Sequence, residues 1–324
     1  MNLPSYDDVL AAEPVVRRHL APTALYEWPL LSATLGFRYL LKHENHQPTG
    51  AFKVRGGVNL LARLSDADRR RGIVACTTGN HGQSLAYASR LFGVPCVLVV
   101  PRSANPDKVA AMRALGAGIV EHGNDFDDAR TFCDDFARQR FLRYVHSANE
   151  PDLIAGVGTM ALEIFERLPT PDVVLVPIGL GSGVCGTCLV ASSRKTKVIG
   201  VQAEGAPAVA RSWRENRVVE MGSPATFAEG VATRKPAEMT LALMRRYLYD
   251  MVLVSDDELR DAIGALLRTT HNLAEGAGAA ATAAAFKLRE RLQGKTVVGI
   301  LSGGNLDLRE LRTIADRFAS NGSA

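Results

Sequence analysis

The sequence predicts an α/β protein of two lobes, each an open, mostly parallel twisted sheet flanked by helices. Apolar strand-like runs alternate with helix-like segments along most of the chain, and this alternation restarts after residues 149–151. The 324 residues, 47% of them hydrophobic, can also build a larger core than one lobe normally holds. We therefore expect a large domain of residues 1–65 and 150–324, with a small domain of residues 66–149 inserted in it.

The first half of the chain supplies the small lobe. A polar amphipathic helix is expected at residues 7–20 and a short strand at residues 39–42. The strands expected after them are residues 72–76, 96–100, 117–121 and 141–145. The helices expected between those strands are residues 81–91, 106–115 and 125–138. Gly93 and Gly116 follow the first two helices as C-terminal caps would, and Asn105-Pro106 provides an N-cap with proline at the first helical position.

The second half of the chain repeats the alternation. A helix is expected at residues 158–168, before the Pro169-Thr170-Pro171 break. The strands expected next are residues 173–178, 198–203, 251–254 and 297–301. The further helices expected are residues 256–267, 277–288 and 308–318. Strands alternating with helices in this order favour a parallel sheet covered by helices.

Composition excludes several classes of function. The net charge of +4 comes from scattered Lys and Arg, and aromatic residues make up 6% of the chain, so a nucleic-acid partner is not expected. The chain has no signal-peptide pattern at its start and no apolar run long enough to cross a bilayer, so we expect a cytoplasmic protein without a membrane partner. Five cysteines suit reduced thiols, and Cys185-x-x-Cys188 lacks the second pair or nearby histidine of a metal site.

One lysine stands out by its surroundings. Lys53 follows a Pro-Thr-Gly turn and opens an apolar-periodic segment, so it should lie in or beside the first turn of a helix, with Thr49 or Gly50 near the cap. The partial positive charge at a helix start, together with burial, favours the free amine over the ammonium. A free amine is a good nucleophile or base.

Three further loops follow directly after expected strands, where ligands of open parallel sheets bind. Residues 77–82 offer hydroxyls, an amide and helix-start N–H groups, which suit a carboxylate. His81 in this loop is a tempting general base, although a histidine at a first helical turn is more often a packing or capping residue. Residues 302–305 suit one hydrogen bond to a flat ligand.

The glycine loop at residues 179–183 suits a phosphate, because glycines let backbone donors approach closely. It also begins the spacing Gly181-x-Gly183-x-x-Gly186, with Glu204 ending the next strand, which matches a dinucleotide-binding fingerprint. An NAD-dependent oxidoreductase is therefore an alternative prediction.

Three motifs taken together point to a known family: PTGAFKVRG at residues 48–56, TGNHGQ at 78–83 and SGGN at 302–305. With them the chain resembles the fold-type II pyridoxal-phosphate (PLP) enzymes, which share the tryptophan synthase β-like fold. The resemblance is closest to the serine/threonine dehydratase and serine racemase branch and extends from about residue 15 to 318. A homodimer is expected by the same resemblance.

The resemblance implies a role for each motif residue. Lys53 would form the Schiff base with the cofactor, with Phe52 packed beside it. Asn80 would bond the ring 3-oxygen and Ser302 the pyridine nitrogen. The residues implied to hold the phosphate are Gly179, Leu180, Gly181, Ser182 and Gly183. Those implied to bind the substrate, chiefly its carboxylate, are Thr77, Thr78, Asn80 and His81.

The implied activity is that of a PLP-dependent lyase. Lys53, freed when a serine- or threonine-like β-hydroxy amino acid binds the cofactor, would remove the Cα proton, and loss of water would lead to a 2-oxo acid and ammonia. An uncharged serine at the ring nitrogen makes the ring a weaker electron sink, which favours β-elimination over transamination.

Departures from the family pattern bear on two alternatives. Thr78 supplies a hydroxyl where racemases of this branch carry a serine acid/base, so racemase or mixed racemase-dehydratase activity is an alternative. Another β-elimination or replacement reaction is a further one. Many relatives bind a divalent cation with two acidic residues near Glu204, but Ala210 stands at the second position, so no metal is predicted.

Overall fold

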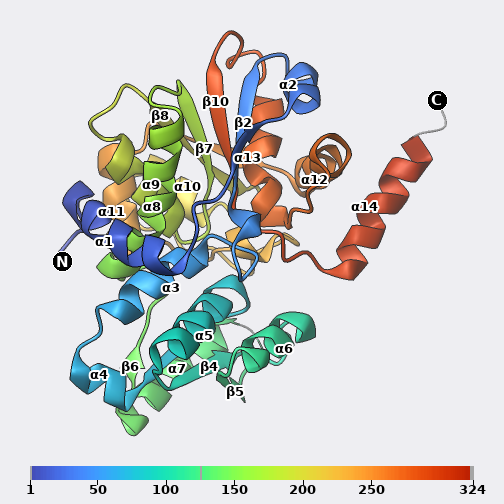
Figure 1. The fold of residues 1–324 in the computed structure, drawn as a ribbon. Coiled ribbons are helices and arrows are strands. Elements are labelled where there is room, and N and C mark those ends of the chain that lie inside the picture. Colours follow the sequence, from blue (N-terminus) through green and yellow to red (C-terminus); the bar gives the residue numbers. More distant parts are fainter. Residues whose placement is uncertain (1, 125, 322–324) are drawn as a thin grey trace.

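The computed structural model describes residues 2–124 and 126–321, and the strands in these ranges form two separate sheets (Figure 1). The larger sheet has the order β1 (Leu25–Glu27), β2 (Arg38–His43), β10 (Thr296–Leu301), β7 (Val173–Pro177), β8 (Lys197–Ala203) and β9 (Asp250–Val254). The smaller sheet has the order β5 (Gly118–Glu121), β4 (Cys96–Val100), β3 (Ile73–Cys76) and β6 (Arg143–Tyr144). The β1–β2 pair is antiparallel and the other described pairs are parallel. The predicted α/β class with two mostly parallel sheets is confirmed.

Helices cover both faces of the larger sheet. One face packs against α2 (Pro29–Leu35), α12 (Asp256–Thr270) and α13 (Gly276–Lys287), with α14 (Leu308–Asn321) outside α12. The other face packs against α1 (Tyr6–His19), α8 (Pro151–Arg167), α9 (Ser182–Ala191), α10 (Ala208–Arg214) and α11 (Glu238–Tyr247). Strand β7 shows the period of two that this requires, since Val173 and Leu175 join the first core and Val174 and Val176 the second.

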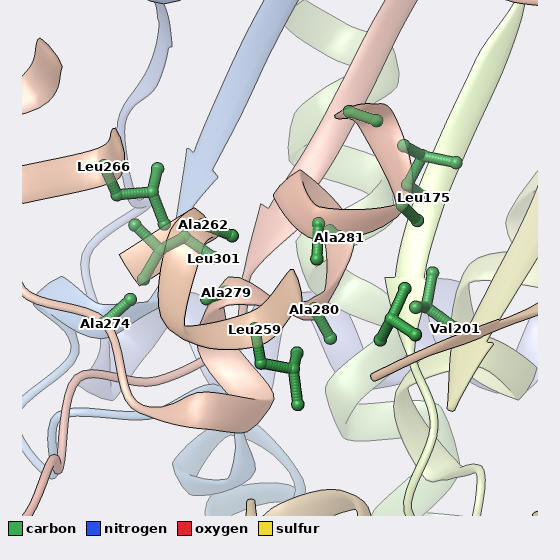
Figure 2. Packing of buried hydrophobic residues seen from close by; sticks show 14 of the residues in the cluster. Leu175, Val201, Leu259, Ala262, Leu266, Ala274, Ala279, Ala280, Ala281 and Leu301 are labelled. Atoms are coloured by element: carbon green, nitrogen blue, oxygen red, sulfur yellow. The ribbon is translucent and has the colours of Figure 1, made fainter. Parts of the chain in front are cut away.

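The alanine-rich helix α13 lies directly on the larger sheet (Figure 2). Its small side chains Ala279, Ala280 and Ala281 are fully buried among larger residues of the strands and of α12. Small side chains let the helix backbone come close to the sheet, and this brings the start of α13 beside the end of β10.

The smaller sheet is covered in the same way. Helices α5 (Asn80–Phe92) and α6 (Pro106–Ala114) pack on one face and α7 (Phe126–Arg140) on the other, while α4 (Asp66–Arg71) precedes β3. Gly93 caps α5 in the left-handed conformation and Asn105 caps α6 with its side chain, as predicted. Within the described ranges, no helix combines the length and apolar character that crossing a bilayer requires.

Helix α3 (Lys53–Ala62) lies between the two groups of elements and packs against both α5 and α8. A Cβ on Gly57 would lie 2.4 Å from Ser84 Oγ, and one on Gly56 would lie 2.8 Å from the carbonyl oxygen of Leu153. Any side chain at these two positions would push the helices apart. The glycine pair therefore permits a close three-helix contact, which offsets its weak helix propensity.

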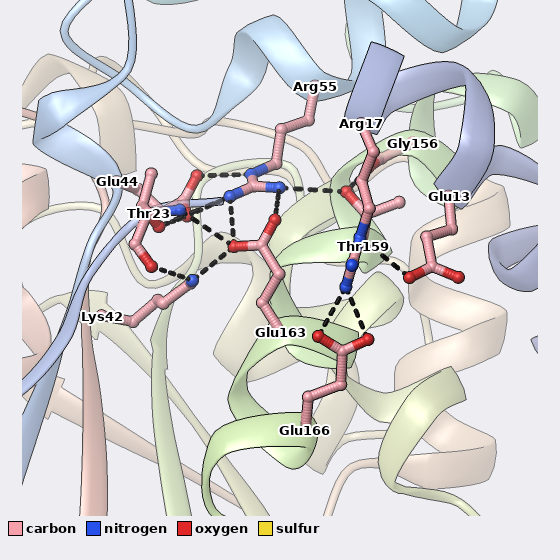
Figure 3. Close-up of polar contacts among 10 residues, drawn as sticks. All are labelled: Glu13, Arg17, Thr23, Lys42, Glu44, Arg55, Gly156, Thr159, Glu163 and Glu166. Atoms are coloured by element: carbon pink, nitrogen blue, oxygen red, sulfur yellow. Dashed lines mark hydrogen bonds and ion pairs between the residues drawn. The ribbon is translucent and has the colours of Figure 1, made fainter. Parts of the chain in front are cut away.

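A buried ionic cluster anchors the start of α3 (Figure 3). Arg55 Nε donates to Glu44 Oε2 at 2.7 Å, and its Nη1 donates to Glu163 Oε1 at 2.6 Å. Lys42 Nζ donates to the other oxygen of Glu163. Burial alone would raise the pKa of Glu44, but the Arg55 guanidinium outweighs it and holds that pKa below its usual value. The cluster thus joins α3, α8, β2 and the 3-10 helix η1 (Glu44–His46) through mutually neutralising charges.

The structure corrects the expected start of one helix. Helix α8 begins at Pro151 rather than at residue 158, and Gly156 and Gly158 lie inside it. A Cβ on Gly156 would lie 2.6 Å from the carbonyl oxygen of Arg55. Tertiary contact with α3 therefore overrides helix propensity here.

Other differences concern short elements and caps. Sequence periodicity did not predict β1, α2 or α10, because three to seven residues carry too little of it. The N-cap of α3 is Phe52, not Thr49 or Gly50, so Lys53 is the first helical residue. The helix expected at 125–138 is α7, and its expected first residue, Asp125, lies outside the described residues.

Replacing Arg55 tests the cluster. Arg55→Ala leaves two carboxylates buried without their guanidinium, so we expect the free energy of unfolding to fall by about 3–5 kcal/mol, measured by urea denaturation. Arg17→Ala is the matched control, because Arg17 pairs with the half-exposed Glu166 and should cost below about 1 kcal/mol. Equal losses in the two variants would contradict this role for the cluster.

Candidate active site

The lysine turn is fastened to the loop that follows β10. The N–H of Phe52 donates to the carbonyl of Ser302 at 3.0 Å, and the N–H of Gly304 donates to the carbonyl of Gly50 at 2.9 Å. Ala51 and Gly303 form an isolated antiparallel bridge between these bonds. Two segments about 250 residues apart in sequence therefore behave as one structural unit, with Lys53 at its end.

The amine of Lys53 lies beside a hydroxyl group and an aromatic ring. Its Nζ donates to Ser182 Oγ at 2.8 Å and lies 5.2 Å from the centre of the Phe52 ring. Burial lowers the pKa of Lys53 to about 8, because the ammonium is poorly solvated there. At pH 7 the ammonium still predominates, but the free amine is more abundant than it would be at the ordinary lysine pKa of 10.5.

The glycine loop lies opposite this amine. Gly181, with a φ of +102°, is the N-cap of α9, and Ser182 is the first residue of that helix. A Cβ on Gly179 would lie 2.3 Å from the carbonyl oxygen of Gly230, so a side chain there would clash with that neighbouring backbone. Thr240 Oγ1 donates to the carbonyl of Leu180 and holds the loop in place. The result is a helix N-terminus with open backbone donors, which fits a phosphate.

The loop after β3 forms the third side of the site. Thr77 Oγ1 accepts hydrogen bonds from the N–H groups of Gly79 at 3.1 Å and Gly82 at 3.0 Å, so this oxygen organises the start of α5. Thr78 is half-buried, whereas Thr77 is buried. The helix start that follows offers N–H groups suited to a carboxylate.

Asn80 is held by two partners from the larger lobe. Its Nδ2 donates to Glu275 Oε1 at 2.5 Å, and its Oδ1 accepts from Asn305 Nδ2 at 2.8 Å. Ser302, only 5% exposed, donates through Oγ to the carbonyl of Ala277 at 3.3 Å. Asn80 thus contacts the loop of residues 302–305, which also carries Ser302, through Asn305.

The ring of His81 has too low a pKa to serve as a general base. Burial, followed by the nearby charge of Lys53, lowers the pKa of His81 to about 3. The ring is therefore neutral and binds protons weakly. This agrees with the packing interpretation of the histidine rather than the catalytic one.

The structure brings together all the loops singled out from the sequence, and it adds residues that sequence reasoning missed. Ser84 Oγ donates to the carbonyl of Lys53 at 2.6 Å. Thr240 and Glu275 complete the surroundings of the glycine loop and of Asn80. A usable signal existed for Glu275 alone, since it is the single charged residue before an uninterrupted run of Gly, Ala and Thr.

The assembled residues fit a flat, phosphorylated aldehyde. The amine that would bond it lies 2.8 Å from Ser182 of the loop that would hold its phosphate. Hydrogen bonds also join Phe52 to Ser302 and Asn80 to Asn305, so uncharged polar groups that would meet its ring belong to the same network. The dinucleotide interpretation fits less well, because Glu204 at the end of β8 pairs with Lys287 at 3.0 Å and its side chain is 49% exposed. At Ala210, where many relatives carry the second acidic residue, the N–H donates to Gln202 Oε1 at 2.9 Å.

Curated relatives resemble the chain over nearly its full length. An L-threonine ammonia-lyase from Thermotoga maritima is 38% identical over 96% of this chain and 78% of the relative. The catabolic L-threonine dehydratase of Escherichia coli K12 is 35% identical over 95% of both chains.

Solved structures give the same result at the level of the fold and identify the family. The processed threonine deaminase isoform 2 of Solanum lycopersicum matches with a TM-score of 0.91 and 31% identity, over 96% of this chain and 92% of that one. Maize serine racemase matches with a TM-score of 0.91 and 25% identity over all of both chains. The model of the family described as "Pyridoxal-phosphate dependent enzyme" matches residues 16–303. The chain therefore belongs to the pyridoxal-phosphate-dependent enzymes of fold-type II, and its cofactor is pyridoxal phosphate.

Proposed function

We propose that the protein is an ammonia-lyase that removes water from a serine- or threonine-like β-hydroxy amino acid, giving a 2-oxo acid and ammonia. One observation carries the proposal: Lys53 Nζ lies 2.8 Å from the Oγ of Ser182, and Ser182 belongs to the glycine loop that suits a phosphate. Threonine ammonia-lyases and dehydratases among the relatives support this reaction class. Because the family's cofactor is pyridoxal phosphate, the NAD-dependent alternative is set aside.

Each side chain has a separate task in this proposal. Lys53 would bond the cofactor through its amine, and the free amine would take the proton from the substrate Cα. Gly179, Leu180, Gly181, Ser182 and Gly183 hold the cofactor phosphate, while Phe52 packs beside Lys53. When bound, the cofactor supplies an electron sink that stabilises negative charge at Cα.

The other side chains bind the ring and the substrate. Asn80 would donate to the ring 3-oxygen, and Ser302 would meet the pyridine nitrogen without adding a charge. Thr78 and the N–H groups at the start of α5 take the substrate carboxylate, supported by Thr77 and by the neutral ring of His81.

The same proposal includes the division of the chain and its assembly. We assign residues 66–149 to a small substrate-side domain, which is supported by the position of β3, β4, β5 and β6 within that range. Residues 1–65 and 150–324 form the cofactor-binding domain. The proposed assembly is a homodimer, in line with the family resemblance.

A racemase activity is the second candidate. It is favoured by the half-buried hydroxyl of Thr78, on the loop facing the lysine turn, and by the likeness to maize serine racemase. A hydroxyl on the face opposite Lys53 is suited to return a proton to Cα from that face.

The direct test combines a spectrum with a substrate panel. The purified protein should absorb near ~410 nm, and this band should be absent from Lys53→Ala but present in Lys287→Ala, which alters an exposed lysine. Among L and D forms of serine, threonine, 3-hydroxyaspartate and phenylserine, at least one should yield a 2-oxo acid and ammonia in equal amounts. A protein that takes up the cofactor but releases no ammonia from the panel would contradict the lyase assignment.

The lowered pKa of Lys53 predicts how cofactor capture depends on pH. Below its pKa of about 8 the ammonium predominates and cannot attack an aldehyde. The rate at which cofactor-free protein captures pyridoxal phosphate should therefore rise about tenfold per pH unit below 8 and level off above it. A rate that keeps rising to pH 10.5, the ordinary value for lysine, would contradict burial of the amine.

Thr78 separates the two candidate activities. If its hydroxyl returns a proton to Cα, Thr78→Ala should lower racemisation by about 100-fold, because a general acid contributes at least this much. Elimination, which does not need that proton, should stay within about tenfold of wild type. Chiral chromatography of the amino acid and a 2-oxo acid assay measure the two rates, with Thr78→Ser as the control that keeps the hydroxyl. Equal loss of both rates would assign Thr78 to binding alone.

A further inference from the structure

Glu275 is a buried carboxylate beside the site that the proposed reaction does not use. It precedes α13 and is 7% exposed. Its N–H donates to the carbonyl of Gly303 at 3.1 Å, and a Cβ on Gly303 would lie 2.3 Å from its Oε1. The side chain is therefore packed on the loop that joins Ser302 to Asn305. Burying a carboxyl group is costly, so its partners indicate what it contributes.

The partners of Glu275 and Asn305 fix the orientation of the Asn80 amide. Glu275 Oε1 accepts from Asn80 Nδ2, while Asn305 Nδ2 donates to Asn80 Oδ1. Turning the amide over would set its oxygen against the carboxyl oxygen and its NH2 against another NH2. The two contacts therefore select one of two otherwise similar orientations.

Asn305 is itself held in a defined orientation. Its Nδ2 also donates to the carbonyl of Thr49 at 2.9 Å, and its Oδ1 lies 2.5 Å from the position of a Cβ on Gly50. Asn305 thus connects the lysine turn to Asn80. Since Nδ2 of Asn80 carries two hydrogens and Glu275 takes one, the second remains for another acceptor.

Charges on neighbouring elements surround Glu275. Lys108 of α6 pairs with Glu229 of the 3-10 helix η2 (Glu229–Val231), Nζ to Oε2, at 2.6 Å. Burial raises the pKa of Glu275 and the charge of Lys108 opposes this effect, while Glu229 adds to it. Lys108, Glu229 and Glu275 line one cavity of about 230 Å³, with Asn305 at its wall.

We propose that Glu275 is a positioning residue for the cofactor: together with Asn305 it holds the Asn80 amide so that the free hydrogen on Nδ2 serves the 3-oxygen of the ring. This inference rests on the proposed contact between Asn80 and the cofactor. Glu275 itself touches neither cofactor nor substrate and acts through Asn80. Its contribution is the orientation of a hydrogen bond, so an amide in its place retains most of the effect.

The test measures the dissociation constant of pyridoxal phosphate by equilibrium dialysis of the holoenzyme, together with its absorbance near ~410 nm. Glu275→Ala should weaken binding about five- to tenfold, the effect of one well-oriented hydrogen bond, and reduce that absorbance. Glu275→Gln keeps an acceptor for Asn80 and should stay within about twofold of wild type. Glu310→Ala is the matched control, since Glu310 lines the same cavity but pairs with Arg260 at 2.6 Å.

A double-mutant cycle identifies the route of the effect. In an Asn80→Ala background, Glu275→Ala should change the dissociation constant less than about twofold, because the amide it orients is gone. Asn305→Asp replaces the other contact with an acceptor that repels Asn80 Oδ1, and it should weaken binding as Glu275→Ala does. This second variant keeps the test decisive if Glu275→Ala fails to fold, which circular dichroism reports.

The outcomes separate this inference from the proposed function. Wild-type affinity for pyridoxal phosphate in both Glu275→Ala and Asn305→Asp would overturn the positioning role. So would a Glu275→Ala substitution that weakens binding as much in the Asn80→Ala background as in the wild type. The proposed function would still stand if the wild-type protein captured the cofactor and the Asn80→Ala variant bound it much more weakly. A wild-type protein that captures no pyridoxal phosphate would overturn both.

Discussion

The pairing of Arg55 with Glu44 and Glu163 is the constraint on which the site depends. Arg55 lies two residues beyond Lys53 in the first turn of α3, and its guanidinium is tied to carboxylates from η1 and α8. Once Arg55 is fixed, the direction of α3 and the place of its first residue are fixed as well. The two cations have opposite surroundings: the two carboxylates keep Arg55 charged despite its burial, whereas the Nζ of Lys53 meets a hydroxyl and its pKa falls to about 8. A chemically useful amine arises from this contrast.

The site forms where parts of both sheets meet. The loops after β7 and β10 and the lysine turn come from the larger sheet and its surroundings, while the loop before α5 comes from the smaller one. Ligands bind beyond the carboxyl ends of parallel strands because loops and helix starts gather there. In this chain that edge of each sheet contributes to the site. Asn80 donates to Glu275 and accepts from Asn305, and these two hydrogen bonds connect the lobes.

Local patterns predicted much of the fold and part of the site. Asn105-Pro106 and Gly93 mark helix ends by their own backbone preferences, so they could be interpreted without tertiary information. Lys53 was found for the same reason, as a lysine at a turn-to-helix junction. The start of α8 was missed because Gly156 and Gly158 inside it are required by close contacts with α3 and with α1 and α9, which no local pattern reveals. Glu275 escaped notice because its partner Asn80 lies 195 positions away in the sequence.

The central claim is that the amine of the half-buried Lys53 is the group that holds the cofactor. Borohydride reduction of the holoenzyme makes that bond permanent, and peptide mass spectrometry then locates the modified lysine. The account predicts a pyridoxyl-phosphate adduct on the peptide that contains Lys53, close to one per chain. An adduct mainly on another lysine, such as Lys108 at the neighbouring cavity, or no adduct at all, would contradict it.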